Sequence, residues 1–251
     1  MKISENKLLD LISQPLDKLV VFDKIDSTMN YAQANAWSGH NLVIAETQTA
    51  GKGQHGHAFA SPATGIYETI IIPAKTSFIE QPGMLTLGVG VCVRQAIQTV
   101  LGVNTKLKWV NDIYYQQKKC GGILVETKSD AQNQIQHFVI GIGLNLMDNE
   151  QLHEVGAISL AHDDQLKNEL VAKIYDLVIE MIQQPDAQMI IQEYQDHLIW
   201  KNQLVSILVN DDTIVGRLTG VSDDFRLKLV DRQQREYLLT MEASQHLRII
   251  Q

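Results

Sequence analysis

Several features that mark secreted and membrane proteins are missing from this sequence of 251 residues. It contains only two cysteines, Cys92 and Cys120, and no C-x-x-C pair, which excludes a secreted-type disulfide framework and a zinc knuckle. In residues 1–18 charged residues separate the apolar ones, and no long apolar run occurs later in the sequence. We therefore expect neither a signal peptide nor a membrane span.

Positive charge is scarce as well. Acidic residues outnumber Lys and Arg by 29 to 21, which gives a formal net charge of −8, and the two signs are mixed along the chain. A protein whose main role is to bind nucleic acid usually carries a basic stripe. The apolar fraction of 45% is enough for a real core. These properties predict a folded cytoplasmic protein that binds neither nucleic acid nor membranes.

The hydrophobic pattern predicts an α+β region followed by an all-β region. Apolar residues at helical spacing predict helices near the N-terminus and over 28–37, 84–101 and 166–182. Apolar runs predict strands over 19–22, 42–46, 66–73, 120–127 and 135–146. From residue 203 onward five short strands follow in about fifty residues, which favours a small antiparallel barrel. We place the domain boundary between residues 201 and 202, giving domains 1–201 and 202–251.

The stretch TQTAGKGQHGHAF, residues 47–59, contains the spacing G-x-G-x-x-G. In a dinucleotide-binding fold a strand ends directly at the first glycine and a helix begins in the loop. Here four residues separate the strand from Gly51, and Pro62 and Gly65 exclude a regular helix after the loop. A Walker A loop is excluded too, because no Gly-Lys-Ser/Thr closes the motif.

His55 and His57 of the same loop form an H-x-H pair, but no third metal ligand is in view. Two loop histidines exposed to solvent are the simpler interpretation. The residues alone leave two readings of the loop equally open: a functional lid, or a surface excursion that needs glycine for its turns.

Four segments in order resemble the motifs of biotin–protein ligases. They are DSTMNYA at 26–32, ETQTAGKGQHGHAF at 46–59, KWVNDIYYQQKKCGGILVE at 108–126 and IGIGLNL at 140–146. Each motif alone is weak, but the ordered set is specific, and the resemblance covers roughly residues 20–250. It implies an α+β catalytic domain related to class II synthetases, with a mixed sheet and flanking helices, followed by a C-terminal SH3-like barrel.

The resemblance also implies the activity of a biotin–[acetyl-CoA-carboxylase] ligase. In this family the biotin carboxylate attacks the α-phosphate of ATP and forms biotinyl-5′-AMP. A lysine of a biotin carboxyl carrier domain, as in acetyl-CoA carboxylase, then takes the biotinyl group. The implied substrates are biotin and ATP, with Mg²⁺ as the metal. An anion meets a polyanion in the first step, so cations and backbone N–H donors must converge.

Site residues follow from the resemblance position by position. Biotin is expected to contact Ser27, Thr28, Met29, Gln48, Gly51, Lys52, Gly53, Gln54, Lys119, Gly122, Gly141 and Gly143. The adenylate is expected to contact Phe59, Asn111 and Asn145. Lys119 and Asp112 are the expected catalytic residues, with Asp112 also the expected Mg²⁺ ligand. From the residues alone, a helix N-cap is the first explanation of Ser27, and an N-cap can also face a ligand.

The sequence departs from well-studied relatives in the glycine loop and in length. Their loop reads G-R-G-R-x-G-R, whereas Lys52, Gln54 and His57 take the arginine positions here. Lysine does not reproduce the bidentate contacts of guanidinium, so we expect the loop to hold the adenylate less tightly. About 18 residues precede the first strand, too few for a winged-helix domain, so we expect the form without DNA-binding activity.

Two other functions stay open on the sequence. A lipoate-type ligase has the same superfamily fold, although its R-R-x-S-G-G-G loop has no match here. A non-catalytic biotin-binding relative is the second alternative, supported by the altered loop and opposed by Lys119 and Asp112. Whether the chain forms homodimers is also left open.

Overall fold

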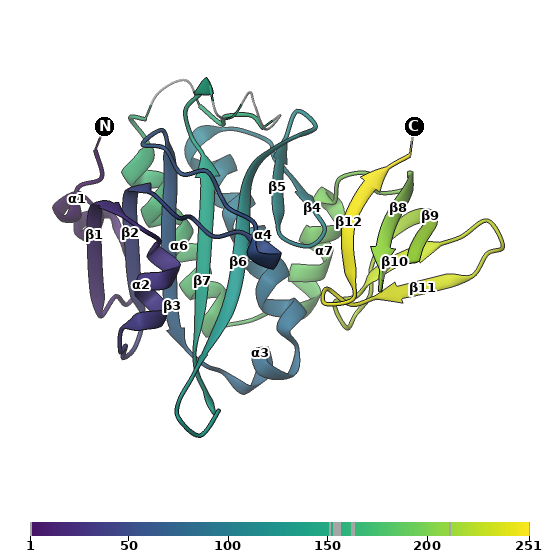
Figure 1. Ribbon diagram of the computed structural model, residues 1–251, viewed down its shortest axis with the longest axis horizontal. Helices are drawn as coiled ribbons and strands as arrows, with labels where there is room; N and C mark the ends of the chain where they lie inside the picture. The colour runs from purple at the N-terminus through teal and green to yellow at the C-terminus, as the bar shows by residue number, and fades with distance from the viewer. Residues whose placement is uncertain (1, 151, 153–156, 162–163, 211, 251) are drawn as a thin grey trace.

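A computed structural model describes residues 2–150, 152, 157–161, 164–210 and 212–250 (Figure 1). Its larger part is a seven-stranded sheet in the order β1-β2-β3-β7-β6-β5-β4. The strands are β1 Lys18–Ile25, β2 Asn41–Gln48, β3 Gly65–Pro73, β4 Lys106–Lys108, β5 Asp112–Tyr115, β6 Lys118–Ser129 and β7 Ile135–Asn145. Strands β1 and β2 are parallel, and the other neighbouring pairs are antiparallel, so the sheet is mixed.

Helices cover the two faces of this sheet unequally. The helices are α1 Glu5–Leu11, α2 Thr28–Ala34, α3 Thr76–Glu80, α4 Pro82–Leu101, α6 Lys167–Gln183 and α7 Ala187–His197. Helices α4 and α6 pack together behind the sheet and form the main core with it, whereas the short α2 lies in front (Figure 1). The front face is therefore partly open, and the candidate site lies on it.

Helix α4 begins and ends where its sequence requires. Pro82 occupies the first turn, where its missing N–H costs no hydrogen bond. Gly102 ends the helix in the left-handed region at φ 68°, a conformation that glycine adopts without a Cβ clash. By length and hydropathy α4 is apolar enough to cross a membrane, but 72% of its most apolar window is buried in the protein. It is the central helix of the core.

A second, five-stranded antiparallel sheet follows, in the order β11-β10-β9-β8-β12. Its strands are β8 Leu204–Val209, β9 Asp212–Val221, β10 Leu227–Val230, β11 Glu236–Leu239 and β12 Ser244–Ile249. All five strands expected from the sequence are present, and the predicted α+β fold with a C-terminal SH3-like unit is confirmed. The division of the chain between residues 201 and 202 stays a prediction.

Some local features differ from the sequence-based expectation. Helix α2 ends at Ala34 instead of residue 37, and the short helix α3 was not expected. Helix α7 was not expected, because only Ile190, Ile191 and Tyr194 are buried along it and most of its other positions are polar. The glycine loop is also more regular than its composition suggests. Phe59 N–H donates to Gly51 O at 2.8 Å and Gly53 N–H donates to His57 O at 2.7 Å. The loop is thus a small hairpin with a short 3-10 turn over Gln54–Gly56.

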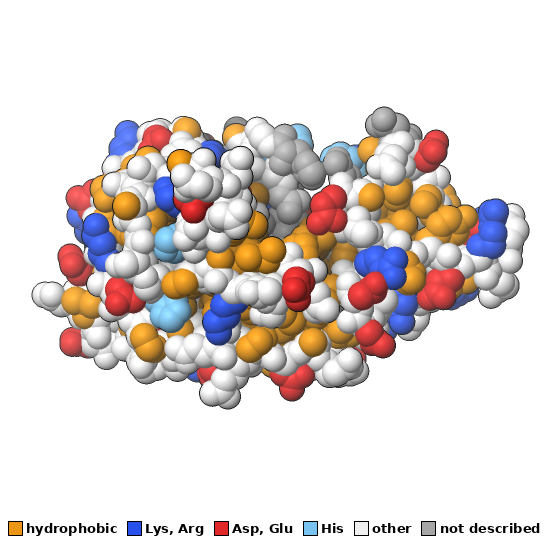
Figure 2. All heavy atoms as spheres, turned by 90° about the horizontal axis from the view of Figure 1, so that it is seen from below, with side chains coloured by type: hydrophobic (Ala, Val, Ile, Leu, Met, Phe, Trp, Pro, Cys, Tyr) orange, Lys and Arg blue, Asp and Glu red, His pale blue; other side chains and the backbone are white. Residues whose placement is uncertain are grey.

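Acidic and basic side chains are interspersed on the face of the molecule seen from below (Figure 2). Hydrophobic patches lie between them, and neither sign forms a continuous stripe on this face. Such mixing gives this face no extended electrostatic field of one sign.

Strand β3 places an unpaired carboxyl group in the core. Glu68 is 1% exposed, and strand alternation puts it on the same face as Ile66 and Ile70. Within the described part of the chain neither of its carboxyl oxygens has a hydrogen-bond partner. Burial raises the pKa of Glu68 well above its ordinary value, because the charged form loses its solvation.

Glu68→Leu is therefore expected to raise the free energy of unfolding by about 1–3 kcal/mol, the typical cost of an unpaired buried polar group. The increase in the free energy of unfolding caused by Glu68→Leu should become larger as the pH rises. The folded protein holds this proton more tightly than the unfolded chain, so the wild type loses stability as pH rises above 4.5 towards the raised pKa. Urea unfolding at pH 5 and pH 8 measures the difference.

Glu46→Gln serves as the contrasting variant. Glu46 accepts from the buried Lys167 ammonium at 2.6 Å, so its replacement should destabilise the protein. A Glu68→Leu gain that is equal at both pH values would contradict the assignment of a raised pKa.

Candidate functional site

A cavity of about 290 Å³ lies between the front of the seven-stranded sheet, helix α2, the glycine loop and strand β12. Among the expected biotin contacts, its lining includes Thr28, Met29, Gln48, Lys52, Gly53 and Gln54. It also includes Lys119, Gly122, Gly141 and Gly143. Of the other expected residues, Phe59, Asn111 and Asp112 line it. Segments that are far apart in the sequence therefore meet at one place.

Two glycines of β7 make the floor of the cavity. A Cβ on Gly141 would lie 2.7 Å from Met29 Sδ, and one on Gly143 would lie 2.7 Å from Phe59 Cε1. Both distances are shorter than van der Waals contact, so any larger residue would displace Met29 or Phe59. The G-x-G spacing matches strand alternation, because residues two apart face the same side of a sheet.

A chain of hydrogen bonds runs along one wall of the cavity. Thr69 Oγ1 donates to Thr28 Oγ1 at 2.8 Å, and Thr28 Oγ1 donates to Gln48 Oε1 at 3.0 Å. The Thr28 backbone N–H donates to the same Gln48 oxygen at 2.8 Å. At the other end of the amide, Gln48 Nε2 donates to Ser61 Oγ at 3.0 Å, and Ser61 Oγ donates to Phe59 O at 2.8 Å.

This chain leaves two polar positions for a ligand. Among the residues that the structure describes, the Thr28 hydroxyl donates once and accepts once, so one lone pair is unused. The Gln48 amide nitrogen has a second N–H, and its oxygen already accepts two bonds. The wall therefore offers an acceptor next to a donor. An uncharged group that carries both N–H and C=O would complement it.

The opposite end of the cavity is cationic. Lys119 Nζ lies 2.5 Å from Asp112 Oδ1, and its side chain is 40% exposed, so the ammonium can still reach a ligand. Lys108 Nζ lies 3.8 Å from Asp112 Oδ2 and sits over the rings of Tyr114 and Trp200 at 5.2 Å and 5.6 Å. Burial lowers the pKa of Lys108, although Asp112 opposes that shift. Two lysines around one carboxylate leave net positive charge for an anion.

The surroundings of Asp112 fit an ion-pair anchor better than a magnesium site held by the protein. Its two oxygens face Lys119 and Lys108, and Glu68, which also lines the cavity, is in no ion pair among the described residues. Over the described residues no group of three or more His, Cys, Asp or Glu side chains could hold a metal. In nucleotide sites Mg²⁺ is usually held by one or two carboxylates together with phosphate oxygens, so the assignment of Mg²⁺ to Asp112 stays a prediction.

Three expected site residues do not line the cavity. Ser27 is fully buried, and its hydroxyl accepts from Asn30 N–H at 3.4 Å as the N-cap of α2. Asn145 is also buried, with its amide 3.5 Å from Ile158 O. Gly51 lies just behind the lining, where its carbonyl accepts from Phe59. Their ligand roles stay predictions.

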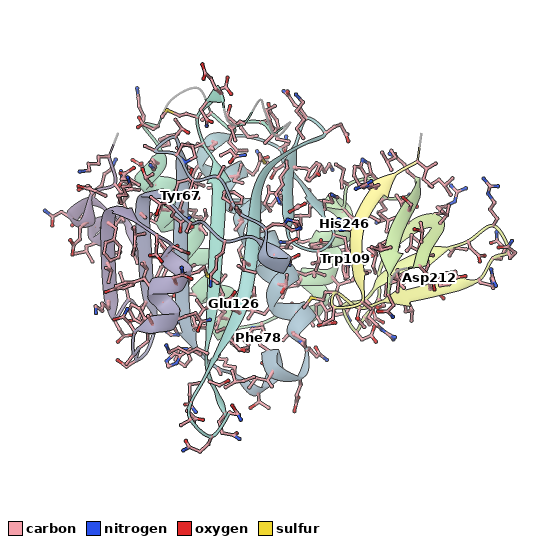
Figure 3. All side chains as sticks on the ribbon, in the orientation of Figure 1. Tyr67, Phe78, Trp109, Glu126, Asp212 and His246 are labelled. Atoms are coloured by element: carbon pink, nitrogen blue, oxygen red, sulfur yellow. The ribbon has the colours of Figure 1, made fainter. Side chains whose placement is uncertain are left out.

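Several lining residues were not expected from the sequence. Lys108 stands inside the KWVND motif, so its charge was a usable signal. Ser244, His246 and Leu247 come from β12 of the second sheet, and no local pattern points to them. Trp109 Nε1 donates to Ser244 Oγ at 2.9 Å across the junction of the two sheets, and both Trp109 and His246 line the cavity (Figure 3). The small C-terminal sheet thus completes the cavity.

Comparisons with known proteins agree with one another. Residues 21–145 match the model of the biotin/lipoate A/B protein ligase family. The bifunctional ligase/repressor BirA of Bacillus spizizenii is 27% identical over 247 residues, covering 89% of this chain and 73% of that protein. The biotin–[acetyl-CoA-carboxylase] ligase of Mycobacterium tuberculosis is 32% identical over 155 residues, covering 57% and 54%.

A solved structure, the biotin protein ligase of Aquifex aeolicus in complex with biotin and ATP, superposes with a TM-score of 0.82. The two sequences are 21% identical, and the superposition covers 93% of this chain and 100% of the other. At this identity the likeness establishes the fold, including the arrangement of both sheets.

Proposed function

The chain belongs to the biotin/lipoate A/B protein ligase family, and on that premise we propose that it is an ATP-dependent biotin–protein ligase. It activates biotin as biotinyl-5′-AMP and transfers the biotinyl group to a lysine of a biotin carboxyl carrier domain. The named relatives include biotin–[acetyl-CoA-carboxylase] ligases, which supports a carboxylase as the acceptor protein.

The wall formed by Thr28 and Gln48 carries the choice of biotin over lipoate. The ureido ring of biotin has N–H donors and a carbonyl acceptor, whereas the dithiolane ring of lipoate has neither. The unused lone pair of Thr28 Oγ1 and the free N–H of Gln48 would bind the ureido group. With lipoate these buried polar groups would stay unpaired, which disfavours its binding.

In the first step a biotin carboxylate oxygen attacks the α-phosphorus of ATP, and the bond from that phosphorus to the pyrophosphate oxygen breaks. Negative charge gathers between the carboxylate and the phosphates. The Lys119 ammonium would stabilise this charge, and Asp112 holds it in place at 2.5 Å. Lys108 adds a second positive charge on the other side of Asp112.

In the second step the amine of the acceptor lysine attacks the acyl carbon of biotinyl-5′-AMP. The acyl bond to the AMP oxygen breaks, the amine loses a proton, and AMP leaves with the electron pair. The ring of Phe59, which lies over Gly143 and 3.7 Å from a Cβ built on Gly122, would stack on the adenylate and keep it in the cavity.

Pyrophosphate exchange tests the proposal. We expect ATP–pyrophosphate exchange that depends on biotin and not on lipoate, together with biotin transfer to a purified carrier domain. Exchange that depends on lipoate would indicate a lipoate-type ligase. Biotin binding in calorimetry without any exchange would indicate a non-catalytic relative.

A further inference from the structure

We infer that Ser61 is a positioning residue that couples the biotin end of the cavity to the nucleotide end. The inference rests on the proposed function, because it concerns how that site binds its two substrates. Ser61 was not among the residues expected from the sequence motifs. Its role follows from where its hydroxyl and its main chain are bonded.

Ser61 joins two segments that carry different parts of the site. Its side chain is buried, with only 5% of the residue exposed. Its hydroxyl accepts from Gln48 Nε2 at 3.0 Å and donates to Phe59 O at 2.8 Å. The main chains also meet, since Gln48 N–H donates to Ser61 O at 3.1 Å. Gln48 lies at the end of β2, and Phe59 closes the glycine-loop hairpin.

The hydrogen bonds on both sides of Ser61 run in the same sense, so that each group accepts from the one before it and donates to the one after it. The Thr69 hydroxyl donates to Thr28, Thr28 donates to Gln48, Gln48 donates to Ser61, and Ser61 donates to Phe59. A group that accepts a hydrogen bond becomes a better donor, so the bonds of such a chain strengthen one another. A ligand N–H that donates to the free lone pair of Thr28 therefore reinforces the later bonds of the chain, including the one that holds Phe59.

Phe59 transmits this effect to the nucleotide end. Its ring lines the cavity over Gly143, and its backbone N–H donates to Gly51 O at 2.8 Å, so it fixes the base of the hairpin that carries Lys52. A fixed Phe59 therefore fixes both the ring that stacks on the nucleotide and the hairpin that carries the Lys52 ammonium. Biotin should thus favour the arrangement that a nucleotide binds, and by linkage a nucleotide should favour biotin to the same degree.

Calorimetry on four proteins tests the coupling: the wild type, Ser61→Ala, Ser61→Thr and Thr64→Ala. The probe is an ATP analogue with a methylene group between the α and β phosphorus atoms, which binds without forming an adenylate. We expect biotin to tighten analogue binding to the wild type about tenfold, within the usual range of coupling between sites. In Ser61→Ala the ratio should fall to about one, because its two hydrogen bonds are gone.

Ser61→Thr keeps the hydroxyl and should keep the coupling. Thr64→Ala is the matched control, since Thr64 lies three residues along the same segment and its hydroxyl accepts from Asn149 at 2.8 Å, away from the cavity. It should also keep the coupling. If Ser61 had a merely structural role, Ser61→Ala would lower the affinity for each ligand separately and leave unchanged the factor by which biotin tightens analogue binding. That result would overturn the inference.

Hydrogen exchange provides a second readout. In the wild type, biotin alone should increase protection of the Gly53 and Phe59 amides, which donate within the hairpin. Ser61→Ala should lose this increase.

If that variant does not fold, Ser61→Cys, whose thiol is a weak donor, should give an intermediate coupling ratio. Coupling in Ser61→Cys equal to that of the wild type would overturn the inference, as would a wild type that binds both ligands without coupling. A wild type that does not bind biotin would instead contradict the proposed function.

Discussion

Lys119→Ala is expected to slow biotin-dependent pyrophosphate exchange by about 10²–10³-fold, the usual loss when one group that stabilises developing charge is removed. Lys119 is the cation closest to Asp112, at 2.5 Å, and its ammonium is partly exposed to the cavity. The variant leaves Asp112 facing the biotin carboxylate, so two like charges would oppose each other. Steady-state exchange, with the folded state checked by circular dichroism, gives the result.

Lys118→Ala is the matched control. Lys118 is the preceding residue in the same strand, is exposed, and does not line the cavity. Its replacement removes the same charge from the protein and should change exchange by less than about twofold, as expected for a surface substitution. Nearly normal exchange in a folded Lys119→Ala protein would remove Lys119 from the proposed mechanism.

Gly51→Ala should weaken biotin binding by about 10²-fold, because the added methyl group breaks two or more buried hydrogen bonds worth about 1–3 kcal/mol each when left unpaired. A Cβ at Gly51 would overlap the Phe59 carbonyl oxygen and lie 2.5 Å from Ser61 Oγ and 3.0 Å from Gln48 Nε2. The first of these neighbours is backbone, so the hairpin itself has to move. Calorimetric titration with biotin measures the loss.

Gly56→Ala separates this steric effect from a general effect of substituting a loop glycine. Gly56 lies at the tip of the same hairpin at φ 77°, and a Cβ there would meet no atom within 4 Å. The expected cost is only the left-handed backbone strain of about 1–2 kcal/mol in the loop, with a smaller effect on biotin. Equal losses for the two variants would show that the contacts around Gly51 do not matter.

Local sequence determined the secondary structure where a single residue type has a clear physical reason to occur. Pro82 and Gly102 delimit α4, Ser27 caps α2, and the five short strands after residue 203 all form. Each of these features depends on neighbours within a few residues, so the pattern in the sequence is sufficient. The site residues expected from the ordered motifs likewise make up half of the residues that line the cavity.

Tertiary structure alone decided which other groups meet these residues. Thr69 and Ser61 complete the hydrogen-bond chain on either side of Thr28 and Gln48, and Ser244 enters from the second sheet through Trp109. Glu68 breaks the apolar pattern of its strand and is buried all the same, because the strand around it is held between β2 and β7. Sequence patterns report periodicity along the chain. Contacts between segments tens or more than a hundred residues apart depend on strand register and packing, which no local pattern contains.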